Sequence, residues 1–332
     1  MSTENSSGRT PPPVPYDPEL EAGLAAFLDM VEQIPLRADT ILANRDHFAG
    51  IIPPIEVIVG DSPVVVEDRT VPGPEGQPDI VVTIVRPREA VENAPGLYLI
   101  HGGGMVLGTR HFGIDGLIAD VLEFGAVGVS VEYRLAPEHP APAAVEDCYA
   151  GLVWFAEHAA ELGVDPSRIV VMGASAGGGL SAGVSLLARD RQGPAIAGQL
   201  LQCPMIDDRN VNVSTLQYDG LGAWDRNNND TAWNAILGEL RHTDDASPYQ
   251  VPTRMTDLSN LPPAYVDVGA ADIFRDEATD YALRIWATGG QAELHIWAGG
   301  YHGFAGFSPD ALVSRAAAAS RLSWLRRILR TP

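Results

Sequence analysis

The sequence contains few cysteines and few basic residues. Only two cysteines, Cys148 and Cys203, occur among 332 residues, and both lie in apolar segments. A chain of this size can bury a large core without a disulfide, so we expect two buried free thiols. Lysine and arginine total 22 against 43 aspartate and glutamate residues, which gives a net charge of -21. This charge disfavours nucleic acid and anionic membranes as partners and suits an uncharged small molecule better.

Long apolar runs and targeting segments are also missing. The sequence has no apolar stretch of about 18 residues or more, so it predicts no membrane span. Residues 1–17 are polar and rich in proline, without the basic and apolar regions of a secretory signal. We expect these residues to form a disordered tail, and we expect the protein to be cytoplasmic.

Short apolar runs alternate with helical patterns along most of the chain. The runs expected to be strands are 64–66, 80–85, 97–100, 126–131, 168–172, 200–203, 264–268 and 294–297. The helical patterns are 19–32, 143–162, 176–189, 276–287 and 309–329. Strands that alternate with helices predict an α/β fold, in which a mostly parallel sheet is covered by helices on both faces.

One long segment, 207–257, interrupts this alternation. It shows no strand pattern and is rich in Asn and Asp. Long insertions between core strands usually fold over the edge of the sheet that carries the active site. We therefore expect a catalytic domain made of residues 51–206 and 258–332. Residues 18–50 and 207–257 are expected to form a small helical cap over it.

The strongest motif is Gly173-Ala174-Ser175-Ala176-Gly177, which matches G-x-S-x-G. It lies between an apolar strand and a helical pattern, where a tight turn lifts the serine hydroxyl above the sheet. Two alternatives are that Ser175 only caps the helix and that Gly177, Gly179 and Ala182 form a dinucleotide fingerprint. The second alternative does not fit the position of these residues. A dinucleotide fingerprint lies in the first strand-to-helix turn of its fold, whereas these residues follow several strands.

A glycine-rich turn, His101-Gly102-Gly103-Gly104, follows the strand at 97–100. Ester hydrolysis passes through a tetrahedral oxyanion that needs fixed N–H donors. The backbone of this turn and the amide of Ala176 can supply them. A merely flexible turn is the alternative interpretation. We expect His101 to brace the turn by hydrogen bonding.

A base and an acid are expected in later loops, because in this type of hydrolase Ser is followed by Asp or Glu and then by His. Asp272 follows the strand at 264–268 and is favoured over Asp276 and Glu277, which can cap the next helix. His302 lies among glycines beyond the last strand. His295 falls inside that strand, which indicates a core histidine.

Together these motifs resemble the hormone-sensitive lipase family of α/β-hydrolase esterases. The resemblance runs from about Ala94 to the end of the chain. The residues that carry it are His101-Gly102-Gly103-Gly104, residues 133–140, the Ser175 pentapeptide with Gly178, residues 272–277 and His302-Gly303-Phe304. It implies an α/β-hydrolase fold with a Ser175, Asp272 and His302 triad.

The resemblance also implies that the amides of Gly103, Gly104 and Ala176 form the oxyanion hole. The helix at 309–329 is expected to pack on the core, and because it resembles the family's usual contact region it is also a candidate face for a homodimer. The chain departs from the family pattern at Ala174, at Ile273-Phe274 and at Met105, where an aromatic residue is usual. We expect Met105, together with Trp224 and Trp233, to line an apolar pocket.

Other ligand-binding patterns are incomplete. Residues 225–236 begin like a calcium loop, but Asp230 and Ile236 occupy the positions of the required Gly and Glu. The sequence shows no zinc spacing and no phosphate loop, so no cofactor is expected. We therefore predict a serine carboxylesterase for short-to-medium-chain esters. An amide or formamide hydrolase and a non-catalytic binding protein on the same fold are the alternatives.

Overall fold

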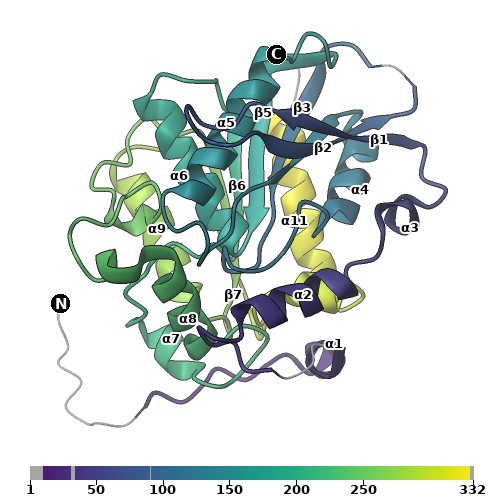
Figure 1. Ribbon diagram of the computed structural model, residues 1–332. Coiled ribbons are helices and arrows are strands. Elements are labelled where there is room, and N and C mark those ends of the chain that lie inside the picture. Colours follow the sequence, from purple (N-terminus) through teal and green to yellow (C-terminus); the bar gives the residue numbers. More distant parts are fainter. Residues whose placement is uncertain (1–9, 31–33, 90, 330–332) are drawn as a thin grey trace.

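A single eight-stranded sheet forms the centre of the computed structural model, which describes residues 10–30, 34–89 and 91–329 (Figure 1). The strands are β1 Val64–Val71, β2 Ile80–Pro87, β3 Ala94–Ile100, β4 Val127–Glu132, β5 Val164–Ala174, β6 Gly198–Gln202, β7 Ala264–Gly269 and β8 Ala292–Trp297. Their spatial order is β1-β2-β4-β3-β5-β6-β7-β8. β2 pairs antiparallel with β1 and β4, and the pairs from β4 to β8 are parallel. The α/β class is confirmed, because every expected strand is present.

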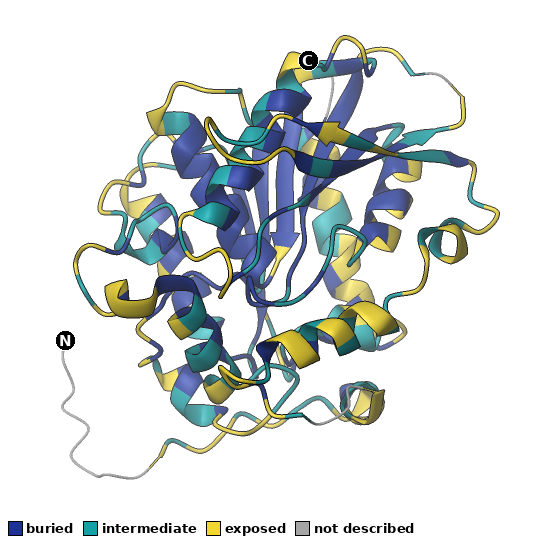
Figure 2. Ribbon diagram, viewed as in Figure 1, coloured by how far each residue is buried: buried dark blue, intermediate teal, exposed yellow. Residues whose placement is uncertain are grey.

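Helices cover both faces of this sheet. One face carries α4 Ile114–Phe124 and α11 Leu312–Ile328, and the other carries α5 Ala143–Glu157, α6 Ala176–Asp190 and α9 Arg275–Ala287 (Figure 1). Alternating residues of β3 point to opposite sides, so Leu97 and Leu99 join one core cluster while Tyr98 and Ile100 join the other. The central strands and the inner helix faces are accordingly buried (Figure 2).

A cap of short helices lies beyond the carboxyl ends of the parallel strands (Figure 1). Its members are α1 Pro18–Met30, α2 Ile41–Ile51, α7 Val213–Gln217 and α8 Arg226–Leu237, with the 3-10 turns η1 Gly238–Leu240 and η2 Pro252–Arg254. The short helix α3 Ile55–Val59 packs against α4 instead. Residues 207–257 contain no strand. The short helix α10 Phe304–Phe307 precedes α11. Within the residues described, no helix is both long and apolar enough to cross a bilayer.

The structure differs from the sequence-based expectation in three segments. Helix α4 was not expected, although its buried residues Ile114, Leu117, Ile118 and Val121 follow helical spacing. Helix α3 is also absent from the expected helical patterns. It lies directly after Pro53-Pro54, and proline is well tolerated at a helix start.

The third difference is in the tail that was expected to be disordered. Residues 1–9 lie outside the described residues, but residues 10–17 pack on the domain. The Tyr218 hydroxyl donates to the Val14 carbonyl at 2.7 Å. The Tyr16 ring stacks on Tyr218 and meets the edge of Tyr301. Aromatic burial outweighs the polar composition of this segment.

Two ion pairs between α4 and α11 offer a matched test of burial. Arg321 binds Asp120 with two hydrogen bonds of 2.5 and 2.8 Å, and the side chains are 16% and 2% exposed. Arg326 pairs with Glu123 between the same helices, but these side chains are 53% and 44% exposed. We expect Arg321→Met to lower the free energy of unfolding by about 3 kcal/mol, because it leaves the Asp120 carboxylate buried without its partner. Arg326→Met should cost less than about 1 kcal/mol. Urea unfolding measures the free energy of unfolding of both variants. Equal losses would contradict the expectation that the buried ion pair contributes more than the exposed one.

Candidate active site

Ser175 occupies a sharp turn between β5 and α6. Its φ is 59°, a left-handed conformation that is rare outside glycine. A Cβ at Gly173 would lie 2.5 Å from the backbone of Gly177, and a Cβ at Gly177 would lie 2.0 Å from the Ile100 carbonyl oxygen. Only glycine therefore fits on both sides of the serine, and the predicted strand-to-helix turn is present.

The structure brings His302 and Asp272 to this serine. The Nε2 atom of His302 lies 3.0 Å from Ser175 Oγ, and its Nδ1 atom lies 2.9 Å from Asp272 Oδ2. The other oxygen of Asp272 accepts the Phe274 amide at 2.9 Å, which fixes the carboxylate. His302 is separated from Ser175 by 127 positions and from Asp272 by 30. A serine, an imidazole and a buried carboxylate thus form one hydrogen-bonded chain.

The electrostatics favour a proton on this imidazole. Burial lowers the pKa of His302, but the Asp272 carboxylate and the neighbouring Cys203 offset that effect and hold the pKa well above the usual histidine range. When the ring is neutral, a carboxylate that binds Nδ1–H leaves Nε2 as an acceptor for a hydroxyl proton. The arrangement can therefore withdraw a proton from Ser175 and stabilise the imidazolium that forms.

The competing residues from the sequence have other partners. Glu277 is buried and accepts the amides of Ile206 and Asp207, and burial raises the pKa of its carboxyl group. Asp276 accepts the Ser214 amide at 2.8 Å. Both carboxylates hold chain segments of the cap insertion. His295 lies within β8 and contacts Glu293 and Ser320.

The glycine turn after β3 runs beside the serine. A Cβ at Gly102 would lie 3.5 Å from Ser175 Cβ. Gly103 and Gly104 have φ values of 110° and 62°, and the Gly103 carbonyl accepts the amides of Val106 and Leu107. His101 braces the turn as expected, because its Nδ1 atom lies 2.8 Å from the Gly102 carbonyl oxygen and its ring stacks on Tyr133.

A cavity of about 910 Å³ opens above these residues. Its lining includes Ser175, His302, Gly103, Cys203 and Trp224, with α1, α2 and the cap insertion supplying the outer walls. Two of the expected pocket residues do not line it. Met105 and Trp233 are buried in the core, at 1% and 0% exposure. Met105 instead receives a hydrogen bond from the Gln250 amide at its sulfur.

Cys203 is the lining residue that the sequence-based reasoning misplaced. Cys148 is buried as expected, but Cys203 is half-buried and borders the cavity. It directly follows β6, and the carboxyl ends of parallel strands carry functional residues. That position could have identified it. Its sulfur lies within 4.8 Å of ligand atoms of Asp272 and His302.

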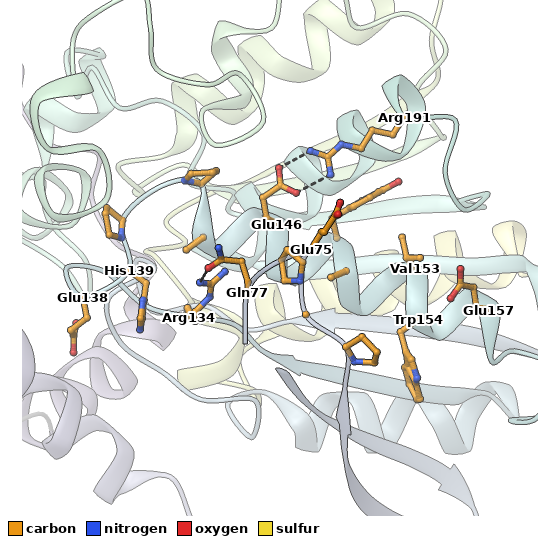
Figure 3. Close-up of a pocket in the computed structure, with 18 of the residues that line it drawn as sticks. Glu75, Gln77, Arg134, Glu138, His139, Glu146, Val153, Trp154, Glu157 and Arg191 are labelled. Atoms are coloured by element: carbon orange, nitrogen blue, oxygen red, sulfur yellow. Dashed lines mark hydrogen bonds and ion pairs between the residues drawn. The ribbon is translucent and has the colours of Figure 1, made fainter. Parts of the chain in front are cut away.

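A second cavity, of about 820 Å³, lies between α5 and the segment that connects β1 to β2 (Figure 3). Figure 3 shows Arg191 pairing with Glu146 across it, and Arg134 lies at its wall. Its lining contains no serine or cysteine. Of these two cavities, only the first is therefore lined by a serine or a cysteine.

A glycine comparison tests the strain in the turn after β3. A Cβ at Gly103 would lie 2.3 Å from the Leu107 carbonyl oxygen, at a φ that L-residues avoid. We expect Gly103→Ala to lower the free energy of unfolding by at least about 1 kcal/mol. Gly116, in α4, has no neighbouring atom at that position, so Gly116→Ala should be neutral or stabilising. Chemical unfolding measures the stability of both variants. A Gly103→Ala variant with the stability of the parent would contradict the strain expected at this position.

The raised pKa of His302 can be measured by nuclear magnetic resonance. We expect its ring to titrate with a midpoint above about 6.5, because Asp272 stabilises the charged form. Asp272→Asn should lower that midpoint. His302→Gln identifies the resonance among the eight histidines. A midpoint that is unchanged in Asp272→Asn would show that the carboxylate is not the cause.

Comparisons with known proteins agree with this geometry. A family described as alpha/beta hydrolase fold matches residues 97–306. Carboxylesterase NlhH from Mycobacterium tuberculosis is 35% identical over 321 residues, which cover 94% of this chain and 97% of that protein. Esterase LipI from the same species is 37% identical over 229 residues, which cover 66% of this chain and 69% of LipI.

Solved structures give the same result. The structure titled Bacterial Heroin Esterase has a TM-score of 0.87 and 38% identity, covering 95% of this chain and 98% of that one. An esterase from the archaeon Pyrobaculum calidifontis has a TM-score of 0.83 and 34% identity, covering 95% and 99%. The chain therefore belongs to the alpha/beta hydrolase fold family, in its hormone-sensitive-lipase-like branch, and is a carboxylic ester hydrolase.

Proposed function

We propose that the chain hydrolyses its esters through an acyl-enzyme, with Ser175 as nucleophile, His302 as base and Asp272 as the acid that orients it. The observation that carries the proposal is the hydrogen-bonded chain from Ser175 through His302 to the buried Asp272, with bonds of 3.0 and 2.9 Å. A serine hydroxyl is a weak nucleophile until an adjacent base removes its proton. His302 is placed to do so at the floor of the cavity.

The amides of Gly103, Gly104 and Ala176 hold the oxyanion in this proposal. The turn at 102–104 lies beside Ser175, and Ala176 is the first residue of α6, so its amide has no partner within the helix. The Ser175 amide is already engaged with the Gln202 carbonyl at 2.9 Å. The positive end of the α6 dipole adds to the stabilisation. One such donor typically lowers the barrier by about 3 kcal/mol.

The two half-reactions use the same groups in reverse. Ser175 attacks the ester carbonyl and gives its proton to His302 Nε2. The imidazolium then protonates the leaving alcohol as the tetrahedral intermediate collapses to the acyl-enzyme. A water molecule enters, loses its proton to His302 and releases the acid, and Ser175 recovers its proton.

The walls of the cavity support an uncharged substrate of short-to-medium chain length. Aromatic and aliphatic side chains line it from three directions, namely Phe27, Leu28, Phe48, Leu107, Phe112, Trp224 and Phe307. A volume of about 910 Å³ holds a small ester with its alcohol group. A homodimer through α11 stays a prediction.

The nucleophile is tested by Ser175→Ala. We expect kcat/KM on 4-nitrophenyl butyrate to fall at least about 10^4-fold, because no other hydroxyl in the cavity has an imidazole partner. Ser185→Ala is the matched control, since it lies on the same helix and its hydroxyl bonds only the Ser181 carbonyl. The control should stay within a few-fold of the parent. A Ser175→Ala variant as active as the parent would refute the proposal.

The same assay separates esters from amides and defines chain length. We expect 4-nitrophenyl butyrate to be hydrolysed far faster than the matched 4-nitroanilide, because an amine leaves only after protonation. Butyrate should also exceed palmitate in kcat/KM, because a long acyl chain would have to lie against the polar side chains of Asn227, Asn228 and Asp230 at the cavity wall. An anilide hydrolysed as fast as the ester would favour the amide hydrolase instead.

A further inference from the structure

Three potential metal ligands meet at the edge of the sheet that carries Ser175. Cys203 directly follows β6, Asp272 lies in the loop after β7, and His302 lies in the loop after β8. These strands are parallel neighbours, so their carboxyl ends lie side by side. The thiol, carboxylate and imidazole ligand atoms are all within 4.8 Å of one another. In the part of the chain that the structure describes, this is the one group of three such residues so placed.

We propose that Cys203, Asp272 and His302 bind a zinc ion, and that zinc bound there inhibits the enzyme. A thiolate, an imidazole nitrogen and a carboxylate oxygen are the three kinds of ligand that zinc takes in proteins. Three protein ligands with one open position are a common zinc arrangement, in which bonds are about 2.0 to 2.3 Å. The three ligand atoms lie within 4.8 Å of one another, so the side chains close onto the ion when it binds. The Cys203 proton leaves to solvent when its sulfur binds.

An entry path exists for the ion. Cys203 and His302 both line the cavity of about 910 Å³. Asp225, Asp230 and Arg37 also border it, and the net charge of the chain is -21. A strongly negative net charge raises the concentration of cations near the protein surface. A divalent cation can therefore reach the thiol by the route the substrate uses.

Zinc and catalysis exclude each other at this site. The imidazole uses Nδ1 for Asp272 and Nε2 for Ser175. If Nε2 binds zinc, its lone pair is no longer available to the serine proton. If Nδ1 binds zinc, the neutral ring carries its proton on Nε2 and again cannot accept one from Ser175. An Asp272 oxygen on the metal no longer orients the ring. The loss of activity therefore rests on the proposed roles of Ser175 and His302, whereas the binding of zinc does not.

Cys203 decides whether the ion binds. Without its sulfur, Asp272 and His302 supply only two ligands, and these are already bonded to each other at 2.9 Å. Sulfur is also the ligand that selects zinc over the magnesium and calcium that carboxylates prefer. Cys148, the other thiol, is fully buried in α5 and does not line the cavity.

Zinc titration of esterase activity tests the proposal. We expect zinc to inhibit the parent, and Cys203→Ser and Cys203→Ala to raise the half-inhibitory concentration by about 10- to 100-fold or more. Each variant is compared with its own zinc-free rate. Cys148→Ala should respond like the parent. Inhibition of Cys203→Ser at the same zinc concentration as the parent would overturn the proposal.

A direct binding measurement makes the result independent of activity. Calorimetry of zinc with Ser175→Ala should show one saturable site, and cobalt should give a thiolate charge-transfer band in the near ultraviolet. Ser175→Ala/Cys203→Ser should lose both. If Ser175→Ala stays active, the proposed nucleophile fails while the metal site can still hold. If Ser175→Ala binds neither metal, the metal site fails whatever the activity shows.

Discussion

The close contact between the Ser175 turn and the end of β3 is the constraint on which the active site depends. Gly177 packs so tightly on the Ile100 carbonyl that no side chain fits between them. The same contact brings the glycine turn that follows β3 beside the serine. The proposed nucleophile and the proposed oxyanion donors are therefore positioned by one packing interaction, independently of the loops that carry Asp272 and His302.

Parallel pairing does the rest, and this explains how much of the fold and the site could be predicted. Each parallel strand ends at the same edge, so a residue after β7 and a residue after β8 must approach one after β5. The periodicity of the apolar runs gave every strand of the sheet, and the motif order gave Ser175, Asp272 and His302, which the structure places within hydrogen-bonding distance. The positions of the strands and the proximity of these three residues depend on the order and direction of the strands, and hardly at all on how individual side chains pack.

The residues that the sequence-based reasoning misplaced depend on local backbone direction. Met105 and Cys203 have φ values of 58° and 35°, and a left-handed residue turns its side chain away from where an extended chain would aim it. Met105 thereby enters the core, and Cys203 borders the cavity. Trp233 is drawn inward because it lies on the buried face of α8, while Trp224 precedes that helix and stays at the wall. The expectation of disorder for residues 10–17 was wrong because it rested on local composition. Tyr16 contacts aromatic residues that are far away in the sequence.

The proposed zinc site follows from the same topology that builds the triad. A buried carboxylate beside an imidazole already presents two metal ligands. Such a pair binds protons but holds a metal ion only weakly as long as no third ligand lies nearby. The residue after β6 stands at the next strand end, within reach of both. With a hydroxyl or methyl group at that position, the carboxylate and the imidazole could only relay protons. The thiol of Cys203 supplies the missing soft ligand. In this proposal, sensitivity to metal is set by Cys203, a side chain to which the proposed hydrolytic mechanism assigns no role.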